Sequence, residues 1–132
     1  MRLFVPPLKT VLRLASPWSF DLHHEHRNKK LFAALGLKFI DMQEWRAIEY
    51  ERTGDRYLGV RTLPPPERVR LPRGTVLVVD RIYIRNGAED FDSITFRVAE
   101  CSKLKGKPRF WAKLADCNRM NVVVVEEEES SK

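Results

Sequence analysis

The feature that most constrains the fold is a succession of short β-rich runs that follows Gly74. Four candidate strands come one after another and are separated by Gly, Pro, Asn and Asp: TVLVVDRIYIR, SITFRVAEC, RFWAKLADC and NVVVVE. Short strands at this spacing are typical of small meandering β-domains. The first run is apolar up to Val79 and alternates after Asp80, as a strand that bends at a corner would. Residues 74–125 are therefore predicted to form a small barrel of SH3-like or OB-like type.

The N-terminal half mixes two periodicities. Residues 8–15 and 18–26 are expected to be the strands of a β-hairpin, because Trp18, Phe20 and Leu22 alternate with polar residues in the second run. The next stretch, NKKLFAALG, has apolar residues at helical spacing.

The ends of the predicted helices have recognisable signals. Asn28 can cap the first helix and Gly36 can stop it. A capping pair of Asp41 and Glu44 predicts a second short helix over residues 42–46. A further hairpin is expected to turn at residues 53–55.

Prolines divide the chain into two parts. LPPPERVRLPRG holds four prolines and favours extended backbone. The predicted fold is α+β and mostly β: an N-terminal β-hairpin with one or two short helices (1–63), a Pro-rich connector (64–73) and the barrel (74–125). These parts are expected to form a single compact domain, 1–125, followed by an acidic disordered tail, 126–132.

The net charge of the chain indicates which kinds of partner the protein can bind. The 132 residues carry a formal net charge of +6. Without the four glutamates and the lysine of residues 126–132, 23 basic side chains remain against 14 acidic ones, a net charge of +9. Such a body attracts phosphates, anionic membranes or an acidic protein surface.

An arginine–aromatic row is the main candidate for a binding surface. If the isoleucines of RIYIR face the core, the residues between them face outward, because side chains alternate across a strand. The same reasoning in the next two strands places basic and aromatic groups on one side: Arg81, Tyr83, Arg85, Arg97, Trp111 and Lys113. The intervening loop adds Lys103, Lys105, Lys107 and Arg109.

Three interpretations of this row remain open. Aromatics on a cationic sheet can stack bases and neutralise phosphates, which favours non-enzymatic binding of DNA or RNA. The same groups could bind a host nucleic-acid-processing protein. Alternatively, Tyr83 and Trp111 pack under the N-terminal half, and the arginines pair with nearby carboxylates.

The three histidines occur together in DLHHEHRNKK. His24 and His26 would share one face of a strand and could ligate zinc with a third group. No HExxH or CxxC pattern accompanies them, so neither a metal nor another cofactor is predicted. Arg27, Lys29 and Lys30 are instead predicted to form a secondary anion site at a helix start. The usual catalytic motifs are absent as well, and we do not expect an enzyme.

The two cysteines indicate the redox environment in which the protein is expected to occur. A hairpin around residues 102–108 would hold Cys101 and Cys117 too far apart for a disulfide. Two free thiols favour a reducing environment. The N-terminus lacks the apolar stretch of a signal peptide, and no run reaches transmembrane length. A cytoplasmic protein without membrane contact is expected.

The stretch LPRGTVLVVDRIYIRNG, with FDSITFRV and RFWAKLADCNRM after it, resembles small basic accessory proteins of phages and other mobile elements. The resemblance covers roughly residues 71–120. It implies a protein that binds nucleic acid or inhibits a host nucleic-acid enzyme, as an anti-defence or anti-CRISPR-like protein does.

Overall fold

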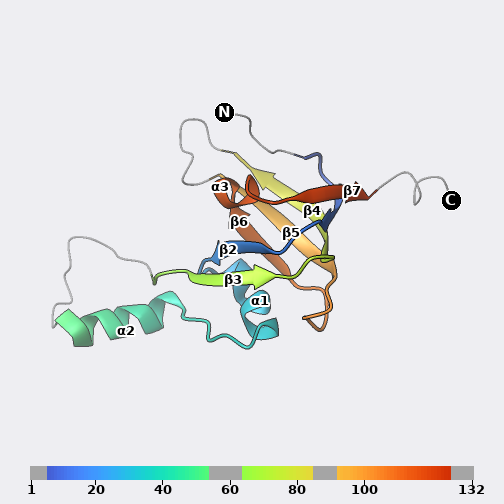
Figure 1. Ribbon diagram of the computed structural model, residues 1–132. Coiled ribbons are helices and arrows are strands. Elements are labelled where there is room, and N and C mark those ends of the chain that lie inside the picture. Colours follow the sequence, from blue (N-terminus) through green and yellow to red (C-terminus); the bar gives the residue numbers. More distant parts are fainter. Residues whose placement is uncertain (1–5, 54–63, 85–91, 126–132) are drawn as a thin grey trace.

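A computed structural model describes residues 6–53, 64–84 and 92–125. The fold is α+β and mostly β, with antiparallel sheets and short helices (Figure 1). Its elements are β1 (Val11–Leu14), β2 (Trp18–Leu22), the 3-10 helix η1 (His26–Asn28), α1 (Lys29–Ala34), α2 (Met42–Thr53), β3 (Glu67–Leu71), β4 (Val76–Tyr83), β5 (Ser93–Glu100), β6 (Arg109–Lys113), α3 (Leu114–Cys117) and β7 (Val122–Val125).

The strands form two sheets. Five of them pair in the order β6-β5-β4-β1-β7, and β2 pairs with β3 in a separate ribbon. Among the described residues no pairing joins the outer strands β6 and β7, so a closed SH3-like or OB-like barrel is not confirmed. α2 extends away from both sheets in Figure 1.

The core lies between the ribbon and one face of the large sheet. Trp18 and Phe20 of β2 stack on each other with ring centroids 4.2 Å apart. Phe20 also stacks on Phe110 of β6 at 5.2 Å, and Trp18 meets Phe96 of β5 edge-on at 5.9 Å. All four side chains are buried. Aromatic contacts of this kind add to the burial of apolar area, so they fix the ribbon on what we call the inner face of the sheet.

Two local predictions for this region are confirmed. The ladder between β4 and β5 shifts register between Val79 and Arg81, which places a bulge at Asp80 where the sequence changes from apolar to alternating. α1 ends before Gly36, whose φ of 74° is the left-handed conformation of a helix stop.

The predicted N-terminal hairpin is wrong. β1 pairs with β4 and β7, whereas β2 pairs with β3. Residues 15–17 carry the chain from one layer to the other, and Pro17 at this corner has no N–H for a ladder. Both strands bury alternate apolar side chains, and each finds a partner from further along the chain.

Three element boundaries differ from expectation. α2 continues to Thr53 instead of ending at residue 46, and the rest of the expected hairpin lies in 54–63, outside the described residues. The Pro-rich connector contains β3, because Val69 and Leu71 pair with Phe20 and Trp18 of β2 and bury their side chains in the core. The run RFWAKLADC leaves the sheet at Lys113 and turns into α3.

Both cysteines are free, as predicted: Cys101 is half-buried and Cys117 is buried. The β5–β6 ladder confirms the hairpin that separates them. None of the helices in the described parts of the chain has the length and apolar character needed to cross a membrane.

Candidate functional site

Cross-strand register places the predicted basic and aromatic residues on one side of the sheet. Residues paired across strands share a face, because side chains alternate along every strand. Arg81, Thr95 and Trp111 form one row, and Tyr83, Ser93 and Lys113 form the next. A third row joins Val78, Arg97 and Arg109. We call Arg81, Tyr83, Arg97, Arg109, Trp111 and Lys113 the cationic face; it lies opposite the inner face that β2 covers.

The charges of the cationic face are unevenly neutralised. Arg109 forms an ion pair with the bulge residue Asp80, with 2.7 Å between Nε and Oδ2. Within the described part of the chain, Arg81, Arg97 and Lys113 form no ion pair. Arg81 is exposed and the other two are half-buried. An excess of positive charge therefore remains on this side of the sheet. Arg85, predicted to extend it, lies outside the described residues.

The β5–β6 loop continues the positive surface past the Arg97–Arg109 row. Lys103, Lys105 and Lys107 are exposed, and Lys103 donates from Nζ to the carbonyl of Arg70 over 3.3 Å. The loop is anchored by buried Leu104, and Gly106 supplies a left-handed turn with φ of 79°.

The free edge of β6 is covered by residues 23–28, which we call the clip. Asn28 is fully buried, and its side chain accepts a hydrogen bond from the backbone N–H of Trp111 at 2.7 Å. Its amide group donates to the carbonyl of His23 at 3.0 Å. An outer strand normally leaves such N–H groups unpaired, and a buried unpaired group is costly. Asn28 was expected to cap α1, but its side chain forms no cap there.

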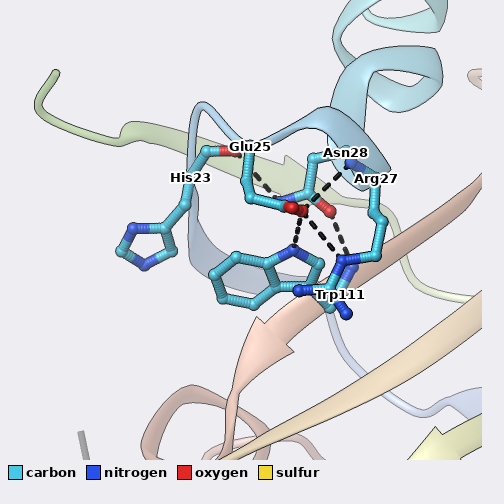
Figure 2. Close-up of polar contacts among 5 residues, drawn as sticks. All are labelled: His23, Glu25, Arg27, Asn28 and Trp111. Carbon is cyan, nitrogen blue, oxygen red and sulfur yellow. Dashed lines mark hydrogen bonds and ion pairs between the residues drawn. The ribbon is translucent and has the colours of Figure 1, made fainter. Parts of the chain in front are cut away.

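The clip also holds the indole of Trp111 (Figure 2). Nε1 of the indole donates to the Glu25 carboxylate at 2.7 Å, and the same oxygen accepts from Nε of Arg27 at 3.0 Å. The His23 ring stacks on the indole with an interplanar angle of 5°, and the Arg27 guanidinium lies 5.7 Å from the ring centroid. Trp111 thus faces the expected side of the sheet, but it is engaged by its own chain, as the packing interpretation predicted.

The hydrogen bonds around Glu25 favour the ionised form of its carboxyl group. Burial alone would raise its pKa, but hydrogen bonds from Trp111 and from Arg27 outweigh burial and lower the pKa below its ordinary value. The carboxylate therefore holds Trp111 and Arg27 together over the whole neutral range.

The predicted secondary anion site is arranged differently from expectation. Arg27 is paired with Glu25, and Lys29 lies 5.9 Å from the ring centroid of Phe39. Lys30 is exposed. Of these three cations, Arg27 is the one placed next to the cationic face, since its guanidinium lies over the ring of Trp111.

The histidines do not lie on a strand, since β2 ends at Leu22. His24 packs against the rings of Phe32 and Phe39, and its Nδ1 accepts from the N–H of Ile40 at 3.1 Å. Burial lowers the pKa of His24, although Glu67, 3.8 Å from Nε2, opposes the shift. Burial lowers the pKa of His23 as well, with a further contribution from Lys113. No group of three or more potential metal ligands occurs in the described segments.

Sequence reasoning missed the roles of Glu25 and Asn28 as partners of Trp111. These residues lie 86 and 83 positions from the tryptophan. A polar residue that is wholly buried has to find a partner, but the local pattern gives no sign that Asn28 is buried. Comparisons of the chain with known protein families, with curated proteins and with solved structures find no match.

Proposed function

We propose that the protein is a non-enzymatic nucleic-acid-binding protein that contacts phosphates through the cationic face. The observation that carries the proposal is the register that puts Arg81, Arg97 and Lys113 on one side of three adjacent strands without acidic partners among the described residues. Cations gathered on one side of a sheet create a positive potential that attracts a polyanion and releases its counterions.

Tyr83 is the aromatic best placed to meet a base. Its side chain is 49% exposed in the row next to Arg81. Trp111 supports the surface instead, because its indole N–H and ring are engaged by Glu25, His23 and Arg27. We therefore assign base stacking to Tyr83 and phosphate contact to the arginines. The lysines of the β5–β6 loop would contact the phosphate backbone of the nucleic acid beyond the cationic face.

The proposal is tested by titrating the protein into a labelled oligothymidylate and into a labelled duplex over a range of salt concentrations. Three phosphate contacts would give a slope of about −2 to −3 in a plot of log affinity against log salt. Affinity that does not change with salt, or no binding at low salt, would contradict the proposal.

A second candidate is a protein-binding inhibitor of a host nucleic-acid enzyme. Tyr83 and Ile84, at the end of the strand that carries Arg81, are 49% and 47% exposed, and aromatic and arginine side chains are the usual anchors of protein interfaces. The resemblance to accessory proteins of mobile elements is compatible with this function as well as with nucleic-acid binding. Capture from host lysate with and without nuclease treatment separates the two candidates, since a protein partner is retained after the nucleic acid has been digested.

Two structural expectations belong to the same proposal. Residues 74–125 would form a small barrel of SH3-like or OB-like type. In folds of this kind a face of the sheet commonly binds nucleic acid. The protein would act in the cytoplasm, where its two free thiols stay reduced.

A further inference from the structure

The aromatic ring of Tyr83 is unoccupied on the cationic face. Its side chain is 49% exposed, and within the described part of the chain it has no stacking partner, no cation over its ring and no hydrogen bond. Trp111 on the same face is the opposite case, because its ring stacks on His23 and its indole N–H donates to Glu25. Tyr83 is therefore the aromatic surface of this face that the described chain leaves open.

Two cations lie near Tyr83 on the same face. Arg81 is two residues earlier on β4, about 6.6 Å away at the usual rise along a strand. Lys113 is in the row of Tyr83 but two strands away, about 10 Å at the usual strand spacing, and only the small side chain of Ser93 stands between them. Neither cation forms an ion pair with another described residue. This combination suits a nucleotide, whose base can stack on the ring while neighbouring phosphates contact the charges.

The cationic face carries no described element that would fit a groove of a double helix. α1 and α3 direct buried side chains such as Phe32 and Leu114 into the core, and α2 extends away from both sheets (Figure 1). The sheet itself is too broad, because five strands about 4.8 Å apart span about 19 Å, whereas a major groove is about 12 Å wide. A duplex would therefore meet the described face only through its phosphates.

Stacking on Tyr83 requires a base that has left the double helix. In a duplex each base is stacked between its neighbours, and only the edges of the bases are accessible in the grooves. In a single strand the bases can turn outward and stack on an aromatic side chain. A single strand can thus use both the ring and the cations of this face, whereas a duplex can use only the cations.

We propose that the cationic face selects single-stranded over double-stranded nucleic acid, with one base stacked on Tyr83 and neighbouring phosphates on Arg81 and Lys113. This inference rests on the proposed function, because it names the form of nucleic acid that the same surface takes. It goes beyond phosphate contact, since phosphates alone would attract both forms. The stacked base can have any identity, because every base has a π face.

The inference is tested with three labelled ligands of equal length at one low salt concentration: an oligothymidylate, the same strand with abasic positions in place of its bases, and a duplex. The oligothymidylate should bind about five- to 150-fold more tightly than the abasic strand, which is the effect of one stacked base, and also more tightly than the duplex. Equal affinities for the oligothymidylate and the abasic strand would overturn the inference.

A duplex that binds as tightly as the oligothymidylate, or more tightly, would overturn the inference as well, but phosphate binding and hence the proposed function would stand. If none of the three ligands binds, the proposed function itself is wrong. The comparison uses the wild-type protein, so it does not depend on the folding of any variant.

Variants at Tyr83 test whether the preference comes from its ring. Tyr83→Ala should bind the oligothymidylate about five- to 150-fold more weakly and the abasic strand as the wild type does, whereas Tyr83→Phe keeps a ring and should bind both as the wild type does. The matched control is Tyr50→Ala, which removes a 41% exposed tyrosine from α2. Undiminished binding by Tyr83→Ala, or an equal loss in Tyr50→Ala, would overturn the assignment of the stacked base to Tyr83.

Discussion

The buried side chain of Asn28 accepts a hydrogen bond from the backbone N–H of Trp111, 83 residues away, at 2.7 Å. One side-chain amide thus supplies a hydrogen-bond acceptor to the outer strand of the large sheet. By donating to the carbonyl of His23, the same group holds the clip against that strand. Asn28 is therefore the residue on which the arrangement around Trp111 depends.

Replacing Asn28 with alanine should lower the free energy of unfolding by about 2–4 kcal/mol, because two partly buried backbone groups, one at Trp111 and one at His23, lose their partners. Urea unfolding measures the change. The matched control is Asn121→Ala, whose exposed side chain should contribute less than about 0.5 kcal/mol. Similar values for the two variants would show that the hydrogen bonds of Asn28 are not structurally important.

Trp111→Ala should destabilise the protein by about 3 kcal/mol, at the low end for a buried aromatic, since the indole is half-buried and loses its contacts with the clip. Trp111→Phe should cost less, because a ring can still stack on His23 while only the bond to Glu25 is lost. Thermal melts and oligonucleotide titrations on both variants are the measurements. A stable Trp111→Ala protein that has lost binding would instead make Trp111 a stacking platform for bases.

Stability should fall as the pH drops below about 6.5. The pKa of His24 is lowered in the folded protein, so below the ordinary value of 6.5 the unfolded chain takes up a proton that the folded chain does not. The loss accumulates from 6.5 down to the folded pKa, and His23 contributes in the same direction. Protonation of His24 at Nδ1 would also break its bond from Ile40.

Urea unfolding at several pH values measures this dependence. A His24→Asn variant, whose amide oxygen can accept from Ile40 without titrating, should show a weaker decline between pH 6.5 and 5. An NMR titration in which His24 takes up its proton above pH 6.5 would contradict the prediction.

The two thiols should react at very different rates. Burial raises the pKa of Cys117, whereas Cys101 is half-buried, with its Sγ 3.4 Å from the hydroxyl of Thr75. Because the thiolate is the reactive species, Cys101 should be alkylated at least about tenfold faster in the native protein. Mass spectrometry of modified peptides checks this rate difference. An intramolecular bridge in the unreduced protein would be incompatible with the β5–β6 register.

Arg97→Ala and Arg81→Ala should each weaken binding to an oligonucleotide and flatten the salt slope by about one unit, with little change in stability. Arg46→Ala on α2 is the control, since it removes an exposed positive charge that lies on another element. Equal losses of affinity in all three variants would mean that binding depends on the overall charge of the protein. The cationic face would then not be the binding surface.

Local sequence patterns were sufficient to predict which side chains share a face. Alternation along the strands put Phe96 and Phe110 in the core and Arg81 and Trp111 on the opposite side, and the chain shows this separation. The change from an apolar to an alternating pattern at Asp80 also predicted an irregularity there, and the β4–β5 ladder shifts register at this point. Side-chain alternation and backbone conformation are local properties, so a single segment contains enough information to predict them.

Which segments become neighbours could not be predicted from local patterns. β1 joins β4 and β7 although β2 is next along the chain, and Asn28 bonds to Trp111 although it stands at a helix start. Every strand offers the same backbone donors and acceptors, so the local pattern does not name its partner. The partner follows from how all the apolar faces are buried together, and that arrangement also determines which charges stay unpaired on the cationic face.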